Sequence, residues 1–379
     1  MLEPRASSAH RWVPCNGSLS MEHPFPDLPH QVVDEGDAAH WVAENCFEGS
    51  GFSPYSMIGL AHENGVVVDA DMAEYVDTYI TEVKSVVQQD RLYIEQSLSG
   101  EWLNHLLKEV TPDAWYYCSE TKTLYVWDLK FGWRVVEAMR NLQMAIYIGS
   151  IIAFLGNVEI LRIEATIVQP RAPHPQGRIR KWHPQTEELS ALFVEVNDSL
   201  VAATGNSPMC LTGEHCRDCK ALAHCRAAQQ AGYTAIEISG HAMIETPTPA
   251  DLAAELNALL AAEEAIKYRK VALETMGTAS AEKGTVIPGF GLERSYGRAC
   301  WKGSTQADID ATVEALEIMT GITLFKKVPL SPAQAKKNGL DDETKKIYVE
   351  TPVRGHKLVR SDATQKATEA FGAALGETT

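Results

Sequence analysis

Residues 111–147 constrain the fold of this chain more than any other stretch. Two short runs of apolar and aromatic residues, 114–117 and 124–127, have the composition of β-strands. Asp128 and Lys130 follow the second run two positions apart, so both side chains leave the same face of a strand. Asp113 precedes the first run, and a hairpin between the two runs could bring both carboxylates to one point. The segment therefore predicts a strand pair that carries two acids and a lysine.

This set of side chains is suited to phosphate chemistry. Two close carboxylates repel each other unless a cation lies between them. A divalent ion such as Mg²⁺ or Mn²⁺, held by Asp113 and Asp128, can orient a phosphate and generate hydroxide. The ammonium group of Lys130 can stabilise charge on the attacked phosphate. We therefore interpret the segment as a metal-dependent nuclease centre in which these three residues are catalytic.

Helices and strands around this segment complete an α/β pattern. Helical character covers residues from Gly36 onward, 71–90, 137–155 and 186–203, and β-patterned runs cover 92–94 and 160–168. On the first helix His40 and Glu44 share a face, and on the third Gln143 and Tyr147 do so. An amide and a phenol placed in this way could hold a DNA phosphate or base edge. Glu95 could reach the metal as an outer ligand, although a surface carboxylate is the commoner role.

The distribution of charge allows a nucleic-acid substrate although the chain is acidic. The formal net charge is −16, but residues 1–110 hold 5 Lys/Arg against 18 Asp/Glu, whereas residues 111–230 hold 12 of each. Binding to phosphates needs a local basic surface rather than a basic chain. Arg178, Arg180 and Lys181 belong to the densest cationic stretch and are candidate DNA-binding residues. A solvated loop is an equally good interpretation of so short a run.

Three closely spaced cysteines indicate a second metal site. No apolar run is long enough to span a membrane and the first residues lack a secretory pattern, so we expect a cytoplasmic protein whose eight cysteines are thiols or metal ligands. Cys216, Cys219 and Cys225 have the spacing C-x2-C-x5-C, which suits zinc or an iron–sulfur cluster. Cys210 would complete a compact zinc site. Cys15 would instead tie the N-terminal segment to the end of the core.

Taken in order, these motifs resemble those of the RecB-like branch of the PD-(D/E)XK nucleases. The four motifs of that branch are similar here to Gly36-x3-His40-x3-Glu44, Asp113, Asp128-x-Lys130 and Gln143-x3-Tyr147. The resemblance covers roughly residues 5–228 and is especially close to phage-encoded RecB-like proteins with a C-terminal extension. Two positions depart from the pattern: Val110 stands where the family often has glycine, and Asp128 where glutamate is commoner.

The resemblance implies both a fold and roles for individual residues. The fold would be the restriction-endonuclease-like α/β core, a mixed sheet flanked by helices, with a smaller C-terminal α/β region. The resemblance implies metal ligation by His40, Asp113 and Asp128. It also implies positioning of the nucleophilic water by Lys130, and contacts to DNA by Gln143 and Tyr147.

The resemblance extends to iron–sulfur members, namely AddB-type and CRISPR-associated RecB-like exonucleases. In those proteins one N-terminal cysteine and a C-x2-C-x5-C motif bind a [4Fe–4S] cluster. The corresponding ligands here are Cys15, Cys216, Cys219 and Cys225. That assignment leaves Cys210 spare, whereas a zinc site would use it.

The rest of the chain completes the expected organisation. We expect a nuclease domain at 1–230, a linker at 231–250, a C-terminal α/β region at 251–360 and a weakly ordered tail at 361–379. The leading hypothesis is a DNA exonuclease of phage or prophage origin that acts in recombination or DNA processing. Its partner beside DNA could be a phage single-strand annealing or replication protein. The alternatives are a catalytically silent DNA-binding protein with a nuclease fold and a regulatory protein organised by zinc.

Overall fold

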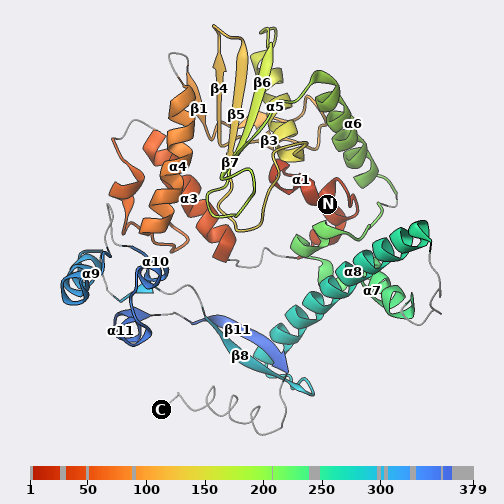
Figure 1. Cartoon of the computed structure of the whole chain (residues 1–379). Coiled ribbons are helices and arrows are strands. Elements are labelled where there is room, and N and C mark those ends of the chain that lie inside the picture. The colour runs from red at the N-terminus through yellow and green to blue at the C-terminus, as the bar shows by residue number, and fades with distance from the viewer. Residues whose placement is uncertain are drawn as a thin grey trace.

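A five-stranded mixed sheet forms the centre of the N-terminal half (Figure 1). The computed structural model describes residues 3–25, 31–47, 51–87, 91–206, 208–238, 248–296, 300–302, 306–324, 330–350 and 353–360. In spatial order the strands are β1 (Leu92–Ile94), β4 (Ala114–Cys118), β5 (Thr123–Leu129), β6 (Arg162–Val168) and β7 (Ile179–Trp182). Neighbouring strands are antiparallel except β5 and β6, which are parallel. The mixed sheet flanked by helices that the resemblance predicted is confirmed.

The parallel pair in this sheet is joined by helix α5 (Leu142–Leu155). Parallel neighbours need a crossover connection, and an amphipathic or apolar helix usually supplies it. The helix begins five residues later than the predicted 137, because Asn141 caps it by accepting a hydrogen bond from the Met144 N–H. Arg140 precedes the cap with a φ of 54°, a backbone conformation that cannot continue into a helix.

Helices cover both faces of the sheet. Successive side chains of β5 alternate between the faces, as in any strand. Leu124 and Val126 pack in the core shared with α5 and with α6 (Thr186–Ala203). Trp127 and Leu129 pack in the core shared with α3 (Gln31–Phe47) and α4 (Ala70–Val86). Asp128 is in phase with Leu124 and Val126, so the strand aims its carboxylate towards α5.

Short elements complete the N-terminal half. They are η1 (Ala6–Ser8), α1 (Ala9–Trp12), α2 (Ser18–Glu22), η2 (Pro54–Met57), β2 (Leu98–Ser99) and β3 (Glu109–Val110). Two 3-10 turns, η3 (Glu214–Asp218) and η4 (Leu222–His224), carry the clustered cysteines. Both turns pack against the long helix that follows, so the cysteine segment connects the sheet domain to the C-terminal half.

The C-terminal half begins with two packed helices, α7 (Arg226–Ile238) and α8 (Pro249–Glu282), seen below the sheet in Figure 1. A smaller α/β region follows. Its strands are β8 (Phe290–Tyr296), β9 (Cys300–Trp301), β10 (Val349–Glu350) and β11 (Val353–Arg360), and its helices are α9 (Gln306–Thr320), α10 (Pro332–Lys337) and α11 (Asp342–Tyr348). β8 pairs with β11 and β9 pairs with β10. The first two strands of this region are therefore hydrogen-bonded to its last two.

Several sequence predictions need adjustment. Residues 231–238 belong to α7 rather than to a linker, because Ala and Ile continue the helix to Ile238. Residues 239–247 and the expected tail at 361–379 lie outside the described residues. Helix α6 has the predicted bounds, and a strand at 92–94 is confirmed. Among the described helices, none combines the length and the apolarity that crossing a membrane requires.

Candidate metal centre

Three potential metal ligands from distant parts of the sequence converge beside the sheet. His40 comes from α3, Glu95 follows β1 and Asp113 precedes β4. The Nδ1 atom of His40 lies 3.3 Å from Glu95 Oε1 and 3.7 Å from Asp113 Oδ2. One ligand atom from each of the three residues lies within 4.8 Å of the other two. This set combines an imidazole with two carboxylates, a donor set that suits a divalent cation such as Mn²⁺.

The pairing of β1 with β4 explains why Glu95 joins this cluster. Ile94 lies opposite Ala114 in the antiparallel register, so Glu95 and Asp113 are the next pair along the ladder. The Glu95 N–H donates to the Asp113 carbonyl oxygen at 3.1 Å. Glu95 has a φ of 44°, a left-handed conformation that costs a non-glycine residue about 1–3 kcal/mol. Strain of this kind is typical of functional sites, and the only sequence signal was a carboxylate directly after a β-run.

Asp128 offers the cluster an unused oxygen. Its side chain is 1% exposed, and Oδ1 accepts a hydrogen bond from Lys130 Nζ at 3.0 Å. The other oxygen, Oδ2, is buried and has no hydrogen-bond partner in the part of the chain that the structure describes. A buried acceptor without a partner costs about 1–3 kcal/mol, so such an atom usually meets a water or an ion. The residues present therefore fit a divalent cation.

Lys130 is held by a chain of hydrogen bonds that runs into α5. Its Nζ donates to Gln143 Oε1 at 2.8 Å, and Gln143 Nε2 donates to the Tyr147 hydroxyl at 2.6 Å. Gln143 and Tyr147 are both buried. These hydrogen bonds fix the lysine, and contacts of the two residues to DNA stay a prediction. The hydrogen bond between them shows that their four-residue spacing places them on one helical face.

The charges at the site shift the pKa values of two of its members. Burial alone would lower the pKa of His40, but the Asp113 carboxylate and the hydrogen bond to Glu95 raise it to about 9. Burial raises the pKa of Asp113 to about 7; His40 opposes this shift, and the Asp128 and Glu95 carboxylates add to it. Both shifts have the sign expected where negative charge is concentrated and a cation is favoured.

A buried tyrosine lies in the field of the same acids. Tyr79 of α4 is 1% exposed, and its hydroxyl has no hydrogen-bond partner among the described residues. Burial raises the pKa of Tyr79 well above its usual range, and the Asp113 and Glu95 carboxylates raise it further. An unpartnered hydroxyl and the unpartnered Asp128 oxygen thus occur at one site. Nothing in the sequence marks Tyr79, since its helical spacing reads as a core position.

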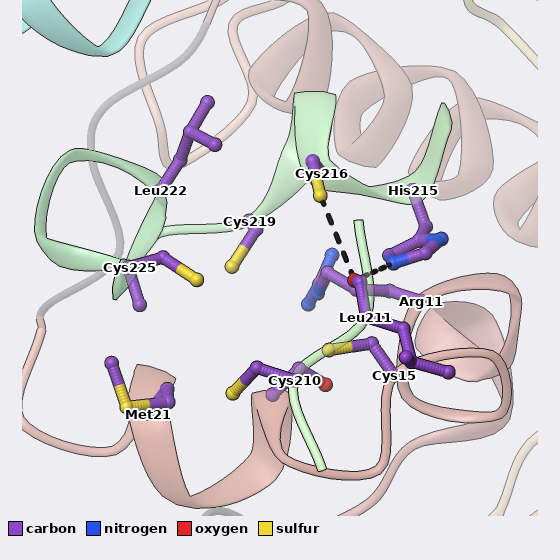
Figure 2. A pocket seen from close by; sticks show the side chains of 12 residues that line it. Arg11, Cys15, Met21, Cys210, Leu211, His215, Cys216, Cys219, Leu222 and Cys225 are labelled. Carbon is purple, nitrogen blue, oxygen red and sulfur yellow. Dashed lines mark hydrogen bonds between the residues drawn. The ribbon is translucent and has the colours of Figure 1, made fainter. Parts of the chain in front are cut away.

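The clustered cysteines line a separate cavity (Figure 2). The five thiols that surround this space belong to Cys15, Cys210, Cys216, Cys219 and Cys225. No three of these sulfur atoms lie within 4.8 Å of one another. Five thiols around one space suit either of the predicted groups, a zinc ion or an iron–sulfur cluster, because both take cysteine thiolates as ligands.

Two hydrogen bonds between neighbouring residues bring Cys15 and Cys210 to this cavity together. The Gly17 N–H donates to the Met209 carbonyl, and the Met209 N–H donates to Asn16 Oδ1. A Cβ atom on Gly17 would lie 2.6 Å from the Cys210 sulfur, so only glycine leaves room for that thiol. Both candidates for the fourth ligand therefore line the cavity. Burial raises the pKa of Cys210 to about 11, with the charges of Cys15 and Cys225 adding to the shift.

The predicted cationic residues have different environments. Arg178 is exposed, with its guanidinium near the ring of Tyr75. Lys181 forms ion pairs with Glu82 and Glu164, both at 2.8 Å. Arg180 is only 2% exposed and is used within the protein, so its assignment to DNA binding was wrong. An alternating strand pattern places neighbouring residues on opposite faces, and β7 turns Arg180 inward.

Comparisons with known proteins give a family and a similarity to a solved structure. Residues 5–365 match the family model "Protein of unknown function (DUF2800)". The chain is also similar to the crystal structure of a protein from Eubacterium rectale described as a "putative exonuclease". The two share 10% sequence identity with a TM-score of 0.32, over 66% of this chain and 92% of that chain. A similarity of this size assigns no activity to this chain.

Proposed function

This chain belongs to the DUF2800 family, and we propose that it is a metal-dependent deoxyribonuclease. One observation carries the proposal: the ligand atoms of His40, Glu95 and Asp113 converge, and they do so on the sheet that also presents Asp128 and Lys130. An acidic cluster of this kind binds a divalent cation, and an ammonium group beside it binds an anion. Phosphodiesters need both at once.

Four side chains of this site would bind the metal ion. His40, Glu95, Asp113 and the free oxygen of Asp128 are the candidate ligands. When bound, Mg²⁺ or Mn²⁺ would supply the Lewis acid that polarises the phosphodiester and activates water. The imidazole ligand favours Mn²⁺ over Mg²⁺, because Mg²⁺ prefers oxygen donors alone.

Lys130 would position the reacting groups. An ammonium group has three N–H donors. Two are directed at Asp128 Oδ1 and Gln143 Oε1, which leaves the third for a water molecule or a phosphate oxygen. The Tyr147 hydroxyl accepts from the Gln143 amide and thereby keeps the amide oxygen turned towards the lysine. This arrangement fixes the ammonium before substrate arrives, which is the form of preorganisation that lowers a barrier.

We propose a structural iron–sulfur cluster as the second element of this function. Cys15, Cys216, Cys219 and Cys225 would be its ligands, with Cys210 as the alternative to Cys15. Linking Cys15 to the segment at 216–225 closes a loop of roughly 200 residues, which restricts the unfolded chain as a cross-link does. Cys216 also packs near Tyr268 of α8, so the cluster would anchor the C-terminal half.

Cleavage of end-labelled DNA tests the nuclease proposal. Anaerobically purified protein is incubated with single- and double-stranded DNA and Mg²⁺ or Mn²⁺, beside Asp128→Ala and Lys130→Ala. Lys270→Ala on α8 is the matched control, because its exposed pair with Glu274 contributes little to stability. Cleavage by the wild type and the control, lost in both site variants, is the expected result. A folded wild-type protein that binds DNA without cutting it would overturn the proposed nuclease activity and favour a catalytically silent DNA-binding protein.

The resemblance of the motifs to RecB-like nucleases also suggests a mode of cleavage, a biological role and a partner. These are an exonucleolytic mode and a role in phage recombination or DNA processing, with a single-strand annealing or replication protein as a partner. A closed circular substrate tests the mode, because an enzyme that needs an end leaves the circle intact while it degrades the linear form. Cutting of both forms at equal rates would replace the exonuclease with an endonuclease.

A further inference from the structure

The loop at 131–141 connects two site residues and exposes apolar side chains. It leaves β5 at Lys130 and enters α5 just before Gln143. Within it Trp133 is 56% exposed and Met139 is 70% exposed. A single exposed apolar residue is common on protein surfaces and by itself indicates no function. Here the exposed tryptophan is three residues from the ammonium group that the proposed reaction uses.

Buried polar side chains hold the backbone of this loop. Gln169 is fully buried; its Oε1 accepts from the Val136 N–H at 3.0 Å, and its Nε2 donates to the carbonyl of Gly132 at 2.9 Å and to that of Arg134. Arg180 donates to the Val136 carbonyl at 2.7 Å and to Gln169 Oε1 at 2.6 Å. A network with satisfied partners rigidifies the segment it contacts. The loop is therefore a fixed support from which Trp133 and Met139 project into solvent.

The Trp133 ring has a rigid backing on one side. The guanidinium of Arg171 lies 4.7 Å from the Trp133 ring centre and 4.5 Å from that of Phe131. Arg171 is itself buried and forms an ion pair with Glu35 at 2.6 Å. Glu35 belongs to α3, the helix that carries His40. The ring thus lies against a guanidinium that Glu35 of the ligand-bearing helix fixes, while more than half of the Trp133 surface faces solvent.

We propose that Trp133 is a stacking site for an unpaired nucleobase of the DNA strand held at the metal centre. This inference rests on the proposed function and specifies its substrate as single-stranded DNA or a frayed end. Bases within a duplex are stacked on one another, whereas an unpaired base offers its face to an aromatic ring. Arg140 in the same loop is exposed and forms no ion pair with the described residues, so it can meet a backbone phosphate.

Binding measurements with an inactive background separate stacking from cleavage. Lys130→Ala protein with Mn²⁺ is titrated with labelled oligothymidylate and with a duplex of equal length, using fluorescence anisotropy. Adding Trp133→Ala should weaken single-strand binding about tenfold, within the roughly five- to 150-fold that one stacked base is worth. Trp133→Phe should retain most of the affinity because it keeps an aromatic face. Tyr233→Ala removes an equally exposed aromatic ring on α7 and should change nothing.

An abasic series locates the base that stacks. At one position an abasic site should weaken binding to the Trp133-containing protein but not to Trp133→Ala, because two changes to one contact are not additive. Additive losses at every position would overturn the inference. Equal weakening of single-strand and duplex binding by Trp133→Ala would also overturn it.

Failure of the inference is distinguishable from failure of the proposed function. Cleavage of single-stranded DNA by Trp133→Ala at the wild-type rate would refute the stacking site alone. Wild-type protein that neither binds nor cleaves any DNA would refute both. Thermal melting controls for folding, and the exposure of Trp133 predicts little change in the melting temperature.

Discussion

Replacing Asp113 by asparagine should stabilise the metal-free protein and abolish its response to metal. Asp113 is buried, and its pKa of about 7 lies about three units above that of an unperturbed aspartate. Ionising it in the folded state above pH 7 therefore costs up to about 4 kcal/mol. Asparagine has the same shape and can still accept the hydrogen bond that the Leu129 N–H donates at 2.6 Å. The neutral residue loses its attraction to His40, so we expect a net gain of about 1–3 kcal/mol.

The sign of this effect changes with pH in a defined window. A raised folded-state pKa means that the Asp113 carboxyl destabilises the fold as pH rises from about 4 through 7. Below about pH 4 the carboxyl is protonated in both states, so wild type and Asp113→Asn should then differ little. At pH 8 with EDTA the variant should melt several degrees higher, because about 1 kcal/mol moves the melting temperature by about 2–4 °C in a domain of about 150–250 residues, the size of the sheet domain.

Metal should reverse the order of the two proteins. Binding at one hundred times the dissociation constant stabilises a protein by about 2.7 kcal/mol. Mn²⁺ should therefore raise the melting temperature of the wild type and leave that of Asp113→Asn unchanged. Differential scanning fluorimetry across pH 4–8, with EDTA or Mn²⁺, measures both effects. A variant that melts no higher than wild type at pH 8 in EDTA, or that keeps the full Mn²⁺ shift, would refute the reasoning.

Four further outcomes follow from the same geometry. Tyr79→Phe removes a buried unpartnered hydroxyl, so calorimetry should show weaker Mn²⁺ binding without loss of metal-free stability; unchanged affinity would place the hydroxyl outside the metal site. Mn²⁺ affinity should rise between pH 6 and 9, because the protons on Asp113 (pKa about 7) and His40 (pKa about 9) must leave; a flat profile contradicts the ligand set. Cys219→Ala should lose bound iron and folded yield before it alters chemistry, and a stable colourless protein would argue against a structural cluster. Asn141→Ala should cost about 1 kcal/mol by removing the cap of α5, measured by denaturant unfolding; a cost of zero would mean that the cap is dispensable.

Local patterns in the sequence were sufficient for much of the fold. The two-residue period of a strand puts Asp128 and Lys130 on one face, and the Lys130 hydrogen bond to Asp128 shows them together. Helical periodicity was enough to bound α6, and the four-residue spacing was enough to pair Gln143 with Tyr147. These features depend on neighbours within a few positions of the chain, which a sequence displays directly.

The tertiary structure decided what each of these residues is free to do. Glu95 enters the metal cluster because β1 pairs with β4 in one particular register, and Arg180 is excluded from the surface because β7 turns it inward. Gln143 is buried against Lys130, and Trp133 is exposed although large aromatic residues are mostly buried in folded proteins. Burial and strand register arise from contacts between residues far apart in the chain. Local periodicity carries no record of such contacts, so the sequence determined the elements and the residue types, and the packing determined their roles.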